Sequence, residues 1–277
     1  MIKKLRQSAV IFSMIFSVIP QVYAGKLAIV IDDIGYRQRE DSAIYALPPQ
    51  IAVAIIPAAP YAKQRNQLAY QQGRDILIHL PMQAKNNMKL ELGGIYLGMS
   101  QNEVAQRVAN AKNIVSYAIG LNNHTGSAAT SNAPLMENLM LALRQHHLFF
   151  LDSRTIGSSV ASKIARQQGI KALDRDIFLD DSDHFHDVQN QFQRAIQYAR
   201  KQGKAVVIGH PRPNTIKVLQ AGLRQLPPDI QLVSISSLWR NEKITPAKPF
   251  ILLFSQQAAP TSTPPFEPVV GLRGMPQ

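Results

Sequence analysis

Short apolar runs alternate with longer amphipathic stretches from Gly25 to about Arg240. Seven of the runs are rich in Ile, Val, Leu and Phe and show no polar alternation, which is typical of strands buried on both faces. They are Leu27–Ile31, Ile51–Ile56, Ile76–Leu80, Leu148–Leu151, Ile177–Leu179, Ala205–Ile208 and Leu232–Ile235. Strands that alternate with helices predict a single α/β domain over residues 25–240, with a parallel sheet that is either open or closed into a barrel.

Local signals mark the ends of several helices. The segment Ser100–Glu103 is a capping box ahead of valines at helical spacing. Asn132 predicts a second helix start, with Pro134 in its first turn. The helix predicted over Val188–Lys201 is followed by Gly203, a good stop signal.

Two segments break this rhythm. Gln83–Met99 contains three glycines and predicts a long loop or small hairpin over one face of the domain. Residues 241–277 form a tail that is rich in Pro, Ser, Thr and Gln, and this composition predicts mostly disorder.

The first 24 residues have the three parts of a secretory signal peptide. Lys3, Lys4 and Arg6 supply the positive charge, and Ala9–Ile19 is apolar but too short for a bilayer, which takes about 20 residues. Small residues then lead to a cleavage site after Ala24. The alternative is an uncleaved anchor. We expect an exported protein, periplasmic or extracellular, with no transmembrane span after signal cleavage.

Composition narrows the possible partners. The chain has 277 residues, no cysteine and a formal charge of +12, which excludes a disulfide scaffold and a thiolate zinc site. The first 24 residues hold three of the 30 basic and none of the 18 acidic residues, so the rest carries +9. Such a charge steers a protein toward anionic partners or simply keeps it soluble. Nucleic acid is a poor candidate partner for an exported protein.

Polar residues follow most of the predicted strands, and in parallel α/β folds such positions converge on one rim. The residues concerned are Asp32, Asp33, His79, Asn123, His124, Asp152, Arg154, Asp180 and His210. A single Asp after a strand is usually a helix cap or a turn former. The pair Asp32–Asp33 differs, because consecutive strand residues point opposite ways and one must face the body of the fold. A buried carboxylate of that kind favours a metal or base role.

Asp together with two or three His is a typical ligand shell for a first-row metal, with zinc the default. Such a site activates water and polarises a carbonyl, and a second carboxylate can serve as general base. The pairs His146–His147 and His184–His186 are further ligand candidates. The chain lacks the Gly-x-Ser-x-Gly elbow of serine hydrolases and the glycine-rich nucleotide motifs.

Five motifs in order resemble the divergent polysaccharide deacetylases (the YibQ-like family), distant relatives of the NodB-type deacetylases of carbohydrate esterase family 4. The motifs are Ala28–Gly35, Leu77–Met82, Asn122–Ser127, Phe150–Thr155 and Ile208–Pro211. The resemblance implies a NodB-like distorted (β/α) barrel with a divalent metal at the carboxyl ends of its strands. It also implies that Asp32 is the general base, that Asp33 and His79 bind the metal, and that His210 is the general acid.

The chain departs from the NodB pattern at three places. Ile34 follows the Asp pair where Gly is usual, and Gln83 stands where the second metal His is expected. His124 is our choice for the third ligand, on residue type and context. The usual arginine motif is not recognisable, and Arg154 is the candidate for holding the base. Three more residues are assigned as substrate contacts or as neighbours that hold the ligands: Asp152, Asp180 and Asn123.

These assignments predict a metal-dependent hydrolase that removes N-acetyl groups from an envelope polysaccharide such as peptidoglycan. One alternative is a catalytically degenerate barrel that binds glycan or an envelope partner. A third hypothesis is metal-dependent cleavage of another bond, such as an amide in the peptide stem.

Overall fold

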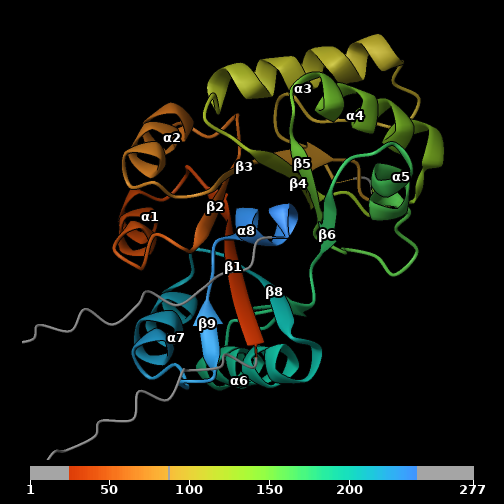
Figure 1. Cartoon of the computed structure of the whole chain (residues 1–277). Helices are drawn as coiled ribbons and strands as arrows, with labels where there is room; N and C mark the ends of the chain where they lie inside the picture. The colour runs from red at the N-terminus through yellow and green to blue at the C-terminus, as the bar shows by residue number, and fades with distance from the viewer. Residues whose placement is uncertain (1–24, 87, 242–277) are drawn as a thin grey trace, which may run out of the picture. The chain divides into compact units, whose positions relative to one another are not determined.

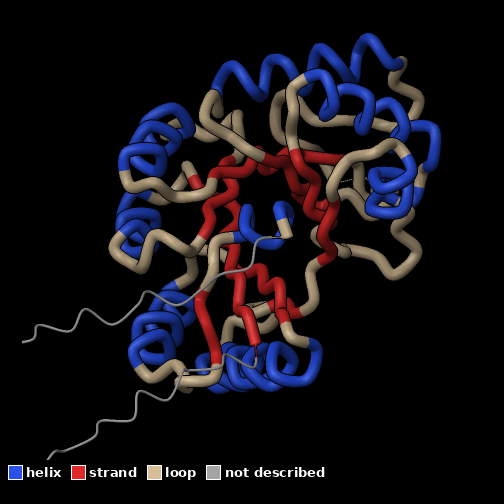
Figure 2. Tube along the Cα trace, viewed as in Figure 1, coloured by secondary structure: helices blue, strands red, loops and turns tan. Residues whose placement is uncertain are grey.

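The computed structural model describes residues 25–241 except Asn87, and within them a sheet of parallel strands lies inside a layer of helices (Figures 1 and 2). The strands are β1 (Gly25–Ile34), β2 (Ala52–Ile55), β3 (Ile76–Met82), β4 (Gly120–Thr125), β5 (Phe149–Asp152), β6 (Ala172–Asp174), β7 (Ile177–Phe178), β8 (Lys204–Gly209) and β9 (Ile230–Leu232). The helices are α1 (Gln38–Tyr45), α2 (Ala62–Gln71), α3 (Gln101–Ile114), α4 (Ala133–Gln145), α5 (Ala161–Gln167), α6 (Phe185–Gln202), α7 (Pro213–Arg224) and α8 (Ile235–Arg240), and a 3-10 turn covers Ala129–Ser131.

The strand order is β6-β5-β4-β3-β2-β1-β8-β7, with β9 paired to the start of β1. The sheet curls into a half-barrel whose two edges, β6 and β7, are consecutive in the chain. The two residues between them cross the opening. The backbone N–H of Arg175 donates to Asp152 on one side, and that of Asp176 donates to Val206 on the other. The predicted α/β single domain with a distorted parallel barrel is therefore confirmed.

Two apolar layers hold this architecture together. The larger one fills the space between the sheet and the outer helices, and the smaller one fills the barrel interior. Trp239 of α8 closes the interior at the amino ends of the strands. Its ring stacks on Phe149 at a centroid distance of 5.1 Å, and its indole N–H donates to the carbonyl of Phe150. Because this end is filled, the carboxyl ends of the strands are the open end available for a site.

The predicted helix signals are confirmed. The Ser100–Glu103 capping box forms, and Asn132 accepts the backbone N–H of Leu135 at 3.0 Å. Gly203 ends α6 in the left-handed conformation, with φ of 78°. The described residues of Gln83–Met99 form a loop that a bridge between Met82 and Ile95 joins to the sheet, and they contain no hairpin.

One predicted strand is wrong in position. The run Leu232–Ile235 spans the last residue of β9, two residues outside any element and the first residue of α8, so Ile235 is helical. Short apolar runs fit a strand and a buried helix turn equally well. The apolar pattern also missed β6, which has only three residues and ends in Asp174, and it missed β4, whose residues are mostly polar.

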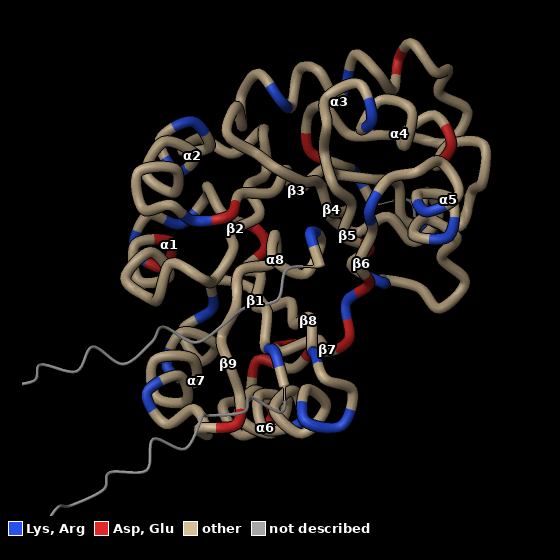
Figure 3. Tube along the Cα trace, in the orientation of Figure 1, with Lys and Arg blue, Asp and Glu red and all other residues tan. Residues whose placement is uncertain are grey.

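Figure 3 shows Lys and Arg on most of the helices rather than gathered on one segment. Within the described part of the chain, no helix combines the length and apolar character needed to cross a bilayer. The predicted signal peptide, 1–24, lies outside the described residues, as does the Pro-rich tail from residue 242 onward.

Candidate metal centre

A bulge at the end of β1 directs both carboxylates of the Asp pair into one site. Ile31 pairs with Val53 and Ile34 with Ile55, so β1 has one residue more than β2 over this stretch. Asp33 takes up the extra length with a left-handed φ of 57°. Such bulges re-aim side chains next to functional sites. As predicted for the pair, one carboxylate faces the body of the fold, since Asp32 is 2% exposed.

Three ligand atoms converge beside this bulge. Asp33 Oδ1 lies 3.2 Å from His79 Nε2 and 3.1 Å from His124 Nδ1, and the two nitrogens are 3.0 Å apart. Ligands bound to one zinc ion at about 2.1 Å lie about 3 to 3.4 Å from one another. Asp33 Oδ1 is also buried without a hydrogen bond of good geometry. The three residues therefore fit a divalent metal.

Neighbouring side chains fix the orientation of both imidazoles. Asn122 Oδ1 lies 2.9 Å from His79 Nδ1, which places the proton on that nitrogen and leaves Nε2 free to bind. For His124 the nitrogen that faces the cluster is Nδ1, and its Nε2 lies 3.5 Å from Glu91 Oε1. A metal-binding His usually donates its other N–H to such an oxygen. Each ring is thus turned with one lone pair toward Asp33.

Asn122 joins the metal ligand to the predicted base. Its Nδ2 donates to Asp32 Oδ1 at 2.8 Å and approaches Ser153 Oγ at 3.2 Å. Asp32 Oδ2 lies 3.6 Å from His79 Nε2 and so faces the ligand cluster. Burial raises the pKa of Asp32 despite the opposing charge of His79. A carboxylate with a raised pKa is the better general base near neutral pH.

The electrostatics of the ligands favour a cation. Burial alone would raise the pKa of Asp33, but the close approach of His124 and His79 holds it well below its usual range. Burial would lower the pKa of His79, yet the carboxylates of Asp32 and Asp33 raise it to about 9. A proton takes the cationic position in this cluster, and a divalent metal that bound there would displace it.

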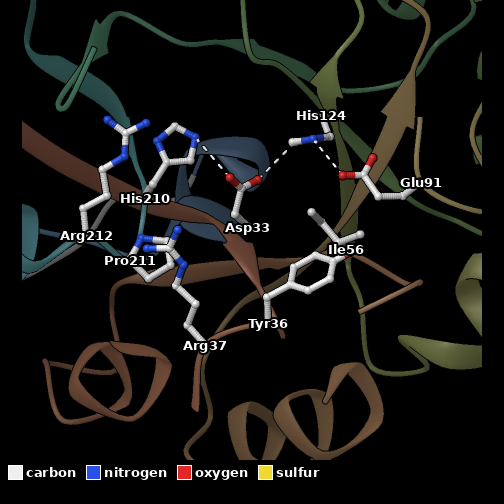
Figure 4. A pocket seen from close by; sticks show the side chains of 9 residues that line it. All are labelled: Asp33, Tyr36, Arg37, Ile56, Glu91, His124, His210, Pro211 and Arg212. Carbon is white, nitrogen blue, oxygen red and sulfur yellow. Dashed lines mark ion pairs between the residues drawn. The ribbon is translucent and has the colours of Figure 1, made fainter. Parts of the chain in front are cut away.

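His210 lies on the opposite side of Asp33, with its Nε2 3.8 Å from Asp33 Oδ2 (Figure 4). Asp180 holds it, because Oδ1 lies 2.9 Å from His210 Nδ1. Burial would lower the pKa of His210, but its contact with Asp180 raises it. The second oxygen, Asp180 Oδ2, accepts the backbone N–H of His210 and the Thr215 hydroxyl. His210 is thus poised as a proton donor whose Nε2 faces the cluster.

A pocket of about 270 Å³ opens over these groups. That is near the lower end of the roughly 300–1,000 Å³ typical of ligand pockets. Tyr36 and Ile56 form one side, and Arg37, Pro211 and Arg212 form the other (Figure 4). Burial, followed by the charges of Glu91 and Asp33, raises the pKa of Tyr36, so it stays a neutral hydroxyl.

The family model that describes the divergent polysaccharide deacetylases matches residues 29–239. The chain belongs to this family. It is 67% identical over 252 residues to an uncharacterized protein of Haemophilus influenzae, covering 91% of this chain and 90% of the relative. It is 42% identical over 244 residues to the uncharacterized protein YibQ of Escherichia coli, covering 88% of this chain and 76% of the relative.

Among solved structures, an uncharacterized protein of Agrobacterium tumefaciens superposes with a TM-score of 0.74 at 19% identity. The match covers 78% of this chain and 90% of that one. At this identity the likeness shows a shared fold alone. The family match on this chain begins within β1, ends within α8 and includes every residue of the candidate centre.

The structure brings together five of the predicted site residues, and three of the other four hold these residues or the loop beside them. Asp32, Asp33, His79, His124 and His210 form the cluster. Asp180 supports His210. Asn123 braces the loop after β5 by accepting the backbone N–H of Ser153. Asp152 caps the same loop through the backbone N–H of Arg154 and the Ser159 hydroxyl.

Arg154 is not brought to Asp32. Its Nε lies 4.0 Å from Asp174, on a half-exposed side chain. The arginine whose charge acts on the predicted base is the half-buried Arg175, which donates to the carbonyls of Ser153 and Arg154. Burial lowers the pKa of Arg175, whereas the charges of Asp152 and Asp32 raise it. Arg175 lies in the two-residue segment between β6 and β7, and no sequence motif indicated it as a site residue.

Sequence reasoning also missed two residues that orient the ligands. Asn122 lies in one of the five motifs, but the sequence assignment names its neighbour Asn123. Strand alternation could have found Asn122, because it points to the same face as His124. Glu91 lies in the irregular loop between β3 and α3, where neither periodicity nor spacing indicates which side chain turns inward.

Proposed function

We propose that this chain is a metal-dependent deacetylase that hydrolyses N-acetyl groups of an envelope polysaccharide. The observation that carries the proposal is the convergence of Asp33 Oδ1, His79 Nε2 and His124 Nδ1 between Asp32 and His210. A buried carboxylate and a raised-pKa imidazole flank the cluster from two sides. This arrangement suits amide hydrolysis, which needs one group to take a proton and one to give a proton.

A divalent metal, with zinc the first choice, would supply Lewis acidity toward a carbonyl and a more acidic water. Asp33, His79 and His124 would hold it. Asp32 takes the proton of the attacking water, and its raised pKa suits that role. Water then adds to the acetyl carbon, the C–N bond breaks, and His210 gives its Nε2 proton to the departing nitrogen. The products are acetate and the free amine.

The substrate assignment rests on family membership and on the predicted export signal. Family membership supports a glycan, and the signal peptide predicted for residues 1–24 supports an envelope location, periplasmic or extracellular. The pocket of about 270 Å³ suits one sugar with its acetamido group rather than a folded protein.

Acetate release from isolated, N-acetylated envelope glycan tests the proposal. The purified protein, loaded with zinc, should release acetate, and Asp32→Asn should abolish release while it keeps its metal. The side-chain oxygen of Asn at position 32 can still accept the hydrogen bond from Asn122 Nδ2, so we expect the fold and the metal ligands to be retained. Release at the parental rate by Asp32→Asn would show that Asp32 is not the base.

Mass spectrometry of the digested glycan separates the competing chemistries. Deacetylation lowers the mass by one acetyl increment and leaves the peptide composition intact. Cleavage of a stem amide would change the peptide composition and overturn the proposal. Saturable binding of glycan without any product, even with added zinc, would also overturn it and would favour a binding barrel.

A further inference from the structure

The pocket over the cluster has two chemically different walls. Arg37 and Arg212 lie on the same wall as His210, to one side of Asp33 (Figure 4). Glu91 lies on the opposite wall, beside His124. A ligand in the pocket therefore meets two guanidinium groups on one side and a carboxylate on the other.

Both arginines have N–H groups to offer a ligand. Arg37 precedes α1 and is exposed, and among the described residues its side chain makes no hydrogen bond or ion pair. Arg212 precedes α7, and one Nη donates to the carbonyl of Asp180 at 2.7 Å. That bond anchors the Arg212 side chain and leaves most of its five N–H groups uncommitted.

The position of His210 orients the sugar. This step rests on the proposed function, in which His210 protonates the departing nitrogen. The sugar carries that nitrogen, so the sugar lies toward His210 and the acetyl group lies toward His79 and His124. The ring substituents next to the acetamido carbon then face Arg37 and Arg212.

We propose that the substrate is an N-acetylated amino sugar with an anionic group, a carboxylate or a phosphate, next to the acetamido group. Arginine recognises both anions through paired N–H donors, and two arginines on one wall match one such group. A neutral sugar would leave both guanidinium groups without a counter-charge. The pocket thus selects by charge as well as by the acetamido group.

Three small sugars test this selection by NMR titration of the zinc-loaded full chain. N-acetylglucosamine is neutral, N-acetylmuramic acid adds a carboxylate, and N-acetylglucosamine 1-phosphate adds a phosphate. A charge-assisted contact of this kind strengthens binding about tenfold or more, so at least one anionic sugar should bind that much more tightly than the neutral one. The sugar preferred identifies the carboxylate or the phosphate as the recognised group.

The preference for the anionic sugar over the neutral one should fall in Arg37→Gln and in Arg212→Gln. In the double variant the ratio of the two affinities should be close to one. Arg39→Gln is the matched control, because Arg39 is exposed two positions further along and lines a different pocket. The preference should persist in this control. Equal affinity for neutral and anionic sugars would overturn the inference, as would a preference that survives in the double variant.

The binding readout keeps this inference separate from the proposed function. Tighter binding of an anionic sugar, without acetate release from any substrate, would contradict the deacetylase proposal and support the anion site alone. Acetate release without a charge preference would keep the deacetylase and remove the anion site.

Discussion

Asp180 holds His210 through both of its carboxylate oxygens. Oδ1 lies 2.9 Å from the ring Nδ1, and Oδ2 accepts the backbone N–H at 2.7 Å. This double contact fixes the ring and its tautomer, so that Nε2 faces Asp33. It also raises the pKa of His210. A general acid must be protonated, so activity should fall as pH rises through that pKa.

Replacement of Asp180 by Asn should therefore move the alkaline limb of the pH–kcat/KM profile to lower pH. The variant removes the negative charge that raises the pKa of His210, and the acid loses its proton earlier. We also expect a loss of about 10- to 100-fold in kcat/KM from the disturbed tautomer. Acetate release measured from pH 5 to 10 checks both effects. Asp181→Asn, at the exposed neighbour, should behave like the parent. An unshifted alkaline limb in Asp180→Asn would show that His210 is not the titrating acid.

Metal content tests the three-residue centre directly. Elemental mass spectrometry of the purified chain should find close to one divalent metal per molecule. Asp33→Ala and His124→Ala should each lose it, because two ligands hold a metal far more weakly than three. His186→Ala, on the exposed start of α6, is the matched control and should keep the metal. No metal in the parent after incubation with zinc would contradict the assignment.

Glu91 should tune metal affinity without being a ligand. Its Oε1 lies 3.5 Å from His124 Nε2, on the side of the ring away from Asp33. Loss of such a partner typically weakens metal binding about 10- to 100-fold. Glu91→Gln should raise the zinc Kd by that factor in a competition assay with a chelating dye. Glu137→Gln, an exposed position on α4, should leave the Kd unchanged. An unchanged Kd in Glu91→Gln would assign this carboxylate to the pocket wall alone.

The barrel was predictable because most of its central strands are continuous apolar runs, with the mostly polar β4 as an exception. Leu27–Val30 and Ala205–Ile208 lie side by side in the register of β1 and β8, and such runs need two covered faces. The short edge strand β6 was not predictable, because three residues carry too little periodicity. The position of β9 was predicted wrongly for a related reason, since one apolar run continues from its last residue into α8.

The candidate centre was predictable to the extent that strand ends define it. Asp33, His79, His124 and His210 all lie at or next to the carboxyl ends of strands. The sequence did not reveal the bulge at Asp33, because a single extra residue relative to β2 depends on pairing. Nor did it reveal Glu91, whose contact with His124 depends on the path of an irregular loop.

Asn122 should matter for both stability and the site. It is fully buried and bonds to His79, Asp32 and Ser153. Asn122→Ala leaves buried polar groups without partners, each of which costs about 1–3 kcal/mol. We expect the free energy of unfolding in urea to fall by at least that amount, together with weaker zinc binding. Asn110→Ala, on the exposed face of α3, should change neither quantity. Parental stability in Asn122→Ala would contradict the bridging role.

Trp239 provides the opposite case, in which stability changes and the metal centre does not. The ring is 3% exposed and packs at the amino ends of the strands, against Phe149 and above Gly120. Trp239→Ala should lower the free energy of unfolding by about 3–5 kcal/mol, the usual range for a large aromatic removed from a core. Trp239→Phe, which keeps much of the packing but loses the N–H bond to Phe150, should lose less. Since the ligands lie at the other end of the strands, folded protein of either variant should bind zinc with the parental Kd. A changed zinc Kd in folded Trp239→Phe would show that the two ends of the barrel are coupled.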